Sequence, residues 1–242
     1  MNKIGLDISK ISTAMSIEVN KKNYLFSYNT MKITQQWNKI LSNIENVKIR
    51  TYLYNNNISN YSDSEINKLD VYIRISNDLI SDILSVIDIN NDTIIYIEGY
   101  SYGKIVNGPL LDLVSIGATI RSKLYENIPN IKEMKIIAPK SLKLSTAEMV
   151  YGAKIVNIGK RKEKIVKIIN YNNNDISGGD FKKIDMYYAI KELNKDHLLK
   201  NLFDNMHEKI IKTKTFPKPI EDLNDAFLLK ELIDFVPLKI NI

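Results

Sequence analysis

Polar and apolar positions alternate over the first thirty residues, which is the pattern of half-buried β-strands. The alternation predicts strands at 3–10, 12–20 and 23–30, and the polar sequence NKKN forms the turn between the last two. Consecutive short strands joined by short turns usually pair with their neighbours in the chain. The start of the sequence therefore predicts an antiparallel meander.

The remainder of the chain switches between helical and strand patterns. Apolar residues spaced three and four apart predict helices, and short runs rich in isoleucine and valine predict strands. The expected helical segments are 34–46, 76–88, 108–126, 159–171, 183–210 and 221–236. The expected strands after the meander are 47–54, 93–98 and 133–139. Strands and helices in this order predict an α/β protein with a mixed sheet.

Carboxylates stand at positions where the pattern calls for buried apolar residues. Asp7 interrupts the first strand, and Glu98 ends an otherwise apolar strand. The apolar stripe of the last helix, continued one turn toward its N-terminus, reaches Asp225 and Asp222. Taken singly, an acid at a strand end can be a solvated edge residue, and Asp222 can favour the positive end of its helix. Taken together, the four acids indicate a shared site.

Carboxylates buried close together need a counter-ion, because desolvation and mutual repulsion both disfavour their charged forms. The chain has no cysteine and only two histidines, so the fitting ion is a hard one such as Mg²⁺ or Mn²⁺. Two such ions, about 3.5–4 Å apart, promote phosphodiester cleavage. Four acids could hold two ions, and the catalytic and metal-binding residues are then Asp7, Glu98, Asp222 and Asp225.

The composition indicates the kind of partner that the protein binds and the compartment in which it is expected. The net charge of +6 agrees with a polyanionic partner, although a chain rich in Asn, Ile and Lys also reflects AT-rich codons. A hydrophobic content of 44% supplies a real core. The absence of cysteine, of a signal-peptide layout and of an apolar run near ~18 residues predicts a soluble, cytoplasmic protein without a membrane segment.

Four motifs follow one another in the chain: a strand with an aspartate, a strand delivering a glutamate before an aromatic-bearing loop, a basic region after a glycine, and a D-x-x-D-A helix. They lie at 4–17, 94–104, 138–169 and 222–229. Their order and spacing resemble the RuvC-like Holliday junction resolvases of the RNase H-like superfamily. That family commonly has Pro-Gly after the first aspartate, whereas this chain has Ile8-Ser9, which leaves the shape of that turn open.

The resemblance implies an RNase H-like fold, with a central mixed five-stranded sheet flanked by helices and a helical insertion. We expect one nuclease domain over 1–242, with insertions at about 51–88 and 171–216. The implied activity is a structure-specific endodeoxyribonuclease that resolves four-way and other branched DNA. It would use two Mg²⁺ ions per site, with Mn²⁺ as a substitute, and the same four acids would be the ligands. A homodimer would suit the near two-fold symmetry of a junction.

The resemblance also implies residues that contact DNA. Tyr100 and Tyr102 lie near the family's aromatic wedge and could stack on an unpaired base or simply anchor the loop. The basic residues expected at the start of a helix, where backbone N–H groups favour phosphate, are Lys160, Arg161, Lys162 and Lys164. Such a cluster can also be a solvated face. Lys140 and Lys143 are weaker candidates, and His197 and His207 are expected to be ordinary surface or core residues.

Two other functions stay open on the same residues. One is an RNase H-like nuclease that acts on an RNA–DNA hybrid, and the other is a non-catalytic protein that binds branched DNA on a decayed nuclease fold. An actin-like or sugar kinase is disfavoured because only nine glycines are spread over the chain. A D-x-E exonuclease is disfavoured because Ser9 stands where its second acid should be. The AT-rich composition would suit a virus, a phage or a low-GC bacterium.

Overall fold

Two β-sheets and a set of helices make up the described residues of this computed structural model, which are 1–55, 57–100, 108–158, 163–193, 197–213 and 218–235. The strands are β1 (Asn2–Asp7), β2 (Ser12–Val19), β3 (Lys22–Asn29), β4 (Val47–Thr51), β5 (Thr93–Glu98), β6 (Ile131–Ile137), β7 (Ala153–Ile158), β8 (Glu163–Tyr171) and β9 (Asn174–Ser177). The α-helices are α1 (Gln35–Ser42), α2 (Tyr61–Leu84), α3 (Gly108–Asn127), α4 (Pro139–Tyr151), α5 (Lys183–Glu192), α6 (Lys200–Thr213) and α7 (Ile220–Glu231). Two 3₁₀ turns are η1 (Gly178–Asp180) and η2 (Leu232–Asp234).

The central sheet has six strands in the order β4-β3-β2-β1-β5-β6. The first three strands form the expected antiparallel meander, while β5 and β6 run parallel to β1. β4 adds a parallel strand beside β3 at the far edge. The mixed α/β fold predicted from the sequence is therefore confirmed. The sheet has the six strands that the sequence pattern predicts, β4 included, which is one more than the five that the resemblance implies.

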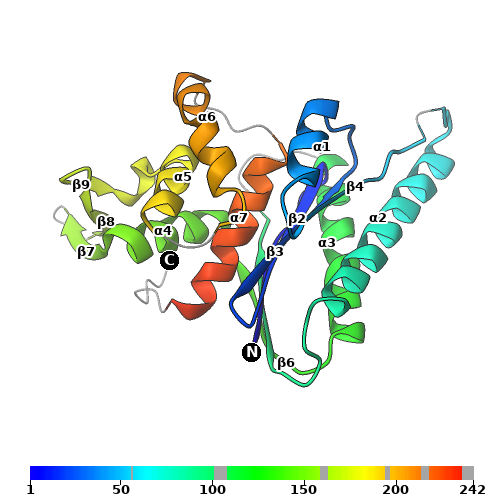
Figure 1. The fold of residues 1–242 in the computed structure, drawn as a ribbon, viewed down its shortest axis with the longest axis horizontal. Coiled ribbons are helices and arrows are strands. Elements are labelled where there is room, and N and C mark those ends of the chain that lie inside the picture. The colour runs from blue at the N-terminus through cyan, green and yellow to red at the C-terminus, as the bar shows by residue number, and fades with distance from the viewer. Residues whose placement is uncertain (56, 101–107, 159–162, 194–196, 214–217, 236–242) are drawn as a thin grey trace.

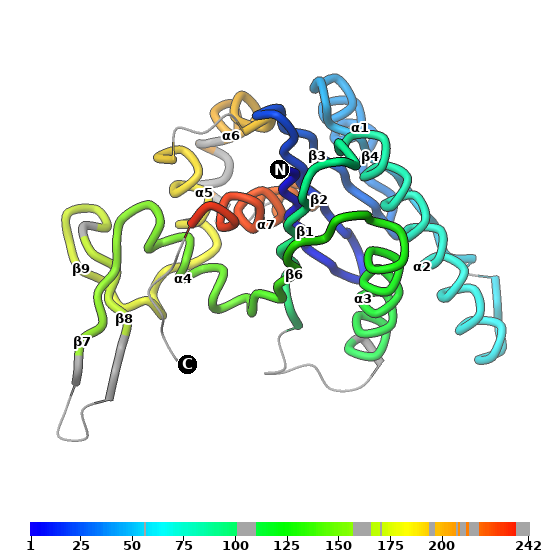
Figure 2. The backbone as a smooth tube through the Cα atoms, turned by 90° about the horizontal axis from the view of Figure 1, so that it is seen from below, coloured from blue at the N-terminus to red at the C-terminus, as the bar shows by residue number. Residues whose placement is uncertain are grey.

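Helices cover both faces of the central sheet, as Figure 1 shows. α2 and α3 lie on one face, where they pack against alternate side chains of the strands, including Ile4 and Leu6 of β1. α7 lies on the other face, and Figure 2 shows it between the sheet and the region of α4 and α5. Because side chains alternate along a strand, Gly5 of β1 faces α7 and not α2.

α7 is buried on nearly every side. Every residue from Asp222 to Glu231 is buried, including the charged Lys230, which is 1% exposed. A helix buried all round lies between two layers and is not a surface helix with a single apolar stripe. The sequence predicted the stripe and its direction but not this second layer, which α4 and the residues of α5 and α6 supply.

The helix expected at 159–171 is wrong over its described part. Residues 163–171 form β8, the middle strand of the sheet β7-β8-β9, which lies at the edge of the molecule farthest from α2. Ile165 pairs with Val156 in β7 and Val166 with Ile155. A short apolar run fits both the helical and the strand period, and pairing with β7 decides for the strand.

Other departures lie between the predicted elements. α2 begins at Tyr61, well before the expected start at 76, and Asn60 caps it by accepting a 2.8 Å hydrogen bond from the Asp63 N–H. α4 was not predicted and begins at Pro139, which suits a first helical position. The helical segment expected at 183–210 consists of two helices, α5 and α6. Among the described residues, no helix combines the length and hydrophobicity that a bilayer crossing requires.

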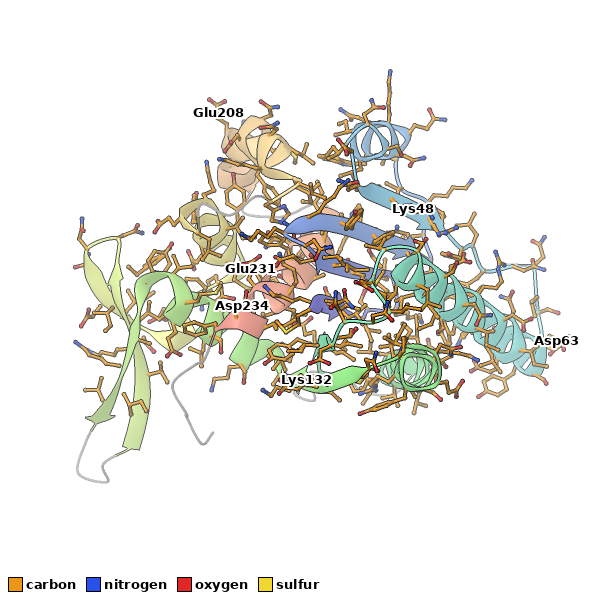
Figure 3. The ribbon with its side chains drawn as sticks, turned by 60° about the horizontal axis from the view of Figure 1, so that its bottom comes forward. Lys48, Asp63, Lys132, Glu208, Glu231 and Asp234 are labelled. Atoms are coloured by element: carbon orange, nitrogen blue, oxygen red, sulfur yellow. The ribbon has the colours of Figure 1, made fainter. Side chains whose placement is uncertain are left out.

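A charged network joins the edge of the sheet to α2. Asp82 on α2 is 2% exposed and accepts hydrogen bonds from Lys48 at 2.6 Å, from Arg50 at 2.9 and 3.1 Å, and from the Tyr28 hydroxyl at 3.0 Å. Lys48, labelled in Figure 3, and Arg50 both belong to β4. Burial alone would raise the pKa of Asp82, but these hydrogen bonds outweigh it and hold that pKa below its ordinary value.

Asp82→Asn should therefore destabilise the protein by about 2 kcal/mol at neutral pH, because it removes charge-assisted hydrogen bonds. A lowered pKa in the folded state means that the stabilisation is present above the ordinary carboxyl pKa and is lost as pH falls below about 4. Urea unfolding at pH 7 and pH 3 should show that the difference in free energy of unfolding between Asp82→Asn and wild type is smaller at pH 3. Asp92→Asn, an exposed acid 3.4 Å from Lys132, should change stability by less than about 0.5 kcal/mol.

Gly5→Ala should destabilise the protein by about 3 kcal/mol or more, because overpacking against backbone cannot be relieved by a rotamer change. A Cβ on Gly5 would lie 2.1 Å from the Ala226 carbonyl oxygen and 2.5 Å from the Lys230 nitrogen. Gly179→Ala is the matched control, since its Cβ would meet nothing nearer than 3.7 Å. Equal urea midpoints for the two variants would show that α7 does not need the bare backbone of Gly5.

Candidate metal centre

Two acids of the site come from neighbouring parallel strands. Asp7 is the last residue of β1 and Glu98 the last residue of β5. The strands are in register up to the pair Leu6 and Ile97, so the two carboxylates leave the sheet side by side at the same edge. The charge at the end of β5 thus lies where a parallel sheet commonly presents functional groups.

The other two acids come from the first turns of α7. Asp222 and Asp225 are three residues apart and so lie on one face of the helix. Their position over the sheet depends on the close approach of Ala226 to Gly5, which lies two residues before Asp7 on the same strand face. The contact that docks α7 therefore also delivers its acids to the end of β1.

Asp7, Glu98 and Asp225 form a compact triad. Each offers a carboxylate oxygen that lies within 4.8 Å of the other two. Asp7 is 4% exposed and Asp225 2% exposed, so water cannot fully solvate either charge. Asp222 is not part of this triad, but it is 1% exposed, and its Oδ2 is buried without a hydrogen-bond partner among the described residues.

Burial and repulsion by neighbouring acids both raise the pKa values of the three aspartates, Asp7, Asp222 and Asp225. Burial raises the pKa of Asp7 well above its ordinary value, and the charges of Glu98, Asp222 and Asp225 raise it further. Burial raises the pKa of Asp225 to about 7, opposed by Lys183 and assisted by Glu98. Burial also raises the pKa of Asp222, against the effect of Lys218. The cluster is therefore short of positive charge.

Two lysines that the sequence analysis did not select contact the acids. Lys183, at the start of α5, donates to Asp225 Oδ2 at 3.0 Å and also to Glu221. Lys218, just before α7, donates to Asp222 Oδ1 and lies 3.8 Å from Glu221. Lys218 could have been found from its spacing, four residues before Asp222. Lys183 is 42 residues from Asp225 and carries no such signal.

The donor set fits a hard divalent cation. The triad offers only carboxylate oxygens, which Mg²⁺ and Mn²⁺ prefer over nitrogen or sulfur ligands. Asp222 Oδ2 adds a buried oxygen that makes no hydrogen bond within the described part of the chain. Asp7, Glu98 and Asp225 could thus hold a metal ion, with Asp222 beside them.

The turn after Asp7 is closed by a serine, although it lacks the Pro-Gly of the proteins that the sequence motifs resemble. The Ser9 hydroxyl donates to the Ser12 carbonyl at 2.9 Å and accepts from the Ser12 N–H at 3.0 Å. Hydroxyl-to-backbone bonds of this kind form tight turns without Pro or Gly. Ser9 therefore shapes the turn, and Asp7 keeps its position at the strand end.

Tyr100 packs against α3. Its hydroxyl accepts a hydrogen bond from Arg121, whose guanidinium also lies 4.9 Å from the ring centre. A Cβ on Gly117 would overlap the Tyr100 hydroxyl, which shows how closely the ring approaches the helix. These contacts hold the ring against the helix, and a role for Tyr100 in stacking on DNA stays a prediction. Tyr102 lies outside the described residues.

The predicted basic residues are spread over two elements. Lys140 and Lys143 lie on the first turns of α4. Lys160, Arg161 and Lys162 lie outside the described residues, and Lys164 belongs to β8. Because residues 163–171 form a strand, Lys164 does not lie at the start of a helix, where backbone N–H groups would favour phosphate. A DNA-binding role for these residues stays a prediction.

His197 was expected to be an ordinary surface or core residue, and it lies in the core. It is 2% exposed, lies 4.1 Å from the Phe227 ring and 5.0 Å from the Phe203 ring, and accepts from the Leu199 N–H at 3.0 Å. Burial, with a further contribution from Lys230, lowers the pKa of His197 to about 3. His207 lies in α6, and its side chain is outside the described part.

Comparison with known proteins gives matches at the level of solved structures. No family model and no curated protein sequence matches the chain. One similar structure is that of T. thermophilus RuvC in complex with a Holliday junction substrate, with a TM-score of 0.44 and 7% identity over 95% of this chain and 91% of that one. Another is the yeast mitochondrial Holliday junction resolvase Ydc2, with a TM-score of 0.42 and 12% identity over 94% and 76%.

Both of these proteins belong to the class that the four sequence motifs resemble.

Divalent cations should stabilise the folded protein through this cluster. A ligand that binds only the folded state adds about 2.7 kcal/mol at a concentration of 100 times its Kd. Asp225→Asn should weaken Mn²⁺ affinity by more than about tenfold, since even changes outside the ligand set cost that much. Calorimetric titration with Mn²⁺ measures it, with Asp70→Asn, an exposed acid on α2, as control. Unchanged affinity in Asp225→Asn would remove this residue from the ligand set.

Proposed function

We propose that the chain is a structure-specific DNA endonuclease that resolves four-way junctions and cuts other branched DNA. The observation that carries the proposal is the acidic triad of Asp7, Glu98 and Asp225 at the edge of the sheet, in which both aspartates are buried and Glu98 is half-buried, with the buried Asp222 beside it. Buried carboxylates that repel one another destabilise a fold, so their presence favours a functional role. Mg²⁺ is the proposed ion, with Mn²⁺ as a substitute and two ions per site.

The bound ions would supply a water nucleophile and neutralise the charge that develops on the leaving oxygen. The chain's own residues determine where this happens. Asp7 and Glu98 fix one side of the site, because both end strands of the same rigid sheet. Asp222 and Asp225 fix the other side, held by the docking of α7. A site built on a central sheet and a buried helix holds its ligands in a preorganised geometry.

Branched DNA is the substrate that the sequence motifs favour. The net charge of +6 agrees with a phosphate-rich partner. Lys140 and Lys143 on α4 are proposed to contact the DNA backbone. We also propose a homodimer, because two sites related by a two-fold axis can nick a junction in paired strands. Sedimentation at assay concentration measures this directly.

A nuclease that acts on RNA–DNA hybrid is the second candidate, since the same acids would serve it. A non-catalytic DNA-binding protein is disfavoured by the triad, because a decayed site has no reason to keep oxygens of three carboxylates, two of them buried, within 4.8 Å of one another. Junction, flap, hybrid and plain duplex substrates, incubated side by side with Mg²⁺, separate the candidates. Cleavage confined to the hybrid would replace the proposed substrate.

Asp7→Asn should still bind a four-way junction but cut it about 10³-fold more slowly, because metal-ion catalysis contributes several kcal/mol to the rate. The variant should fold, since a neutral amide avoids both the burial of a charge and the repulsion that together raise the pKa of Asp7. Denaturing gels give the cleavage rate and mobility-shift gels give the affinity. Asp70→Asn should cut at the wild-type rate, and wild-type cleavage by Asp7→Asn would refute the proposed active site.

A further inference from the structure

Two ammonium groups cover the solvent side of the acidic cluster. The side chains of Lys183 and Lys218 are each 44% exposed, whereas those of Asp225 and Asp222, their partners, are 3% and 1% exposed. Glu221 lies between the lysines, with contacts to both. A row of Lys183, Glu221 and Lys218 thus lies directly outside the buried carboxylates.

Each lysine contacts an oxygen of a carboxylate that also belongs to the candidate metal centre. Lys183 Nζ lies 3.0 Å from Asp225 Oδ2, and Lys218 Nζ donates to Asp222 Oδ1. A divalent cation bound to these carboxylates would lie within a few ångströms of both ammonium groups. Like charges at that separation repel one another by several kcal/mol at the effective dielectric of a protein surface. The lysines and the cations must therefore compete.

The charge balance of the region indicates a further role for the two lysines. The five acids of the region carry five negative charges when ionised, and the two lysines offset two of them. Two divalent ions would turn the remaining three negative charges into one positive charge. One phosphodiester group neutralises that charge. A lysine is suited to this exchange, because its ammonium carries three donors on a flexible stem.

We propose that Lys183 and Lys218 are positioning residues that change partners when metal ions bind. They act as built-in counter-ions for Asp225 and Asp222, compete with divalent cations for those carboxylates, and turn to the backbone phosphate of the nucleic acid once the cations are bound. This inference rests on the proposed nuclease function. It deepens that function by assigning residues that hold the phosphate beside the metal centre.

Lys218→Gln and Lys183→Gln test the competition by calorimetric titration with Mn²⁺ alone. Each should bind Mn²⁺ about tenfold more tightly than wild type, because a competing charge near the cation is gone. Each should also melt at a lower temperature in EDTA. A purely structural lysine would lower the melting temperature without tightening cation binding. Lys218→Arg, which keeps the charge, should retain the wild-type Mn²⁺ affinity.

The phosphate step is tested by cleavage of a four-way junction at saturating Mn²⁺. Both glutamine variants should raise KM about tenfold with a smaller change in kcat, since they lose a contact to the substrate. Lys191→Gln is the matched control, because Lys191 also lies on α5 and pairs with an acid, Asp204, at 3.1 Å. That variant should match wild type in Mn²⁺ affinity and in KM.

The outcomes separate the inference from the function on which it rests. Equal or weaker Mn²⁺ binding in the glutamine variants, beside normal binding and cleavage by wild type, overturns the role of the lysines alone. An unchanged KM overturns the phosphate step. Absence of Mn²⁺ binding by wild type overturns the metal centre, and with it the proposed nuclease.

Discussion

The contact on which the molecule depends is the one between the bare backbone of Gly5 and the carbonyl of Ala226. The absence of a side chain at Gly5 lets α7 lie directly on the central strand. With the helix at this distance, Asp225 reaches the triad with Asp7 and Glu98. A larger residue at position 5 would move α7 away from the sheet. The glycine is thus a requirement of both the fold and the site.

The two ends of α7 differ in their charge balance. At its C-terminal end, Lys3 bridges Glu18 at 2.8 Å and Asp234 at 2.5 Å, and Lys230 reaches Glu18 at 3.2 Å, so each charge has a partner. Figure 3 shows Asp234 at this end of the helix. At the N-terminal end the acids outnumber their partners, and burial raises the pKa of Asp225 to about 7. A well-anchored end lets the protein tolerate the repulsion at the other.

The sequence predicts the first strands and the four acids because these features are local. The meander follows from period-two alternation, and each acid stands out against apolar neighbours. The strand β8 could not be told from a helix, because Ile165 and Ile169 are four residues apart, which fits both periods, and the deciding partner, β7, is a tertiary contact. For the same reason the start of α2 and all of α4 were missed: their helical character depends on the surfaces that they cover.

Separation along the chain also explains which residues of the site could not be predicted from the sequence. Asp222 and Asp225 share a helix face through their spacing, and Lys218 lies only four residues before Asp222 in the chain, so all three could be read locally. Lys183 is 42 residues from Asp225, and only the packing of α5 against the helix layer brings the two together. Acids that interrupt an apolar pattern can be identified from the sequence. A lysine at the start of a polar helix cannot be distinguished there from an ordinary solvent-exposed charge. The counter-charges of a buried acidic site are therefore the part of its chemistry that depends most on the tertiary structure.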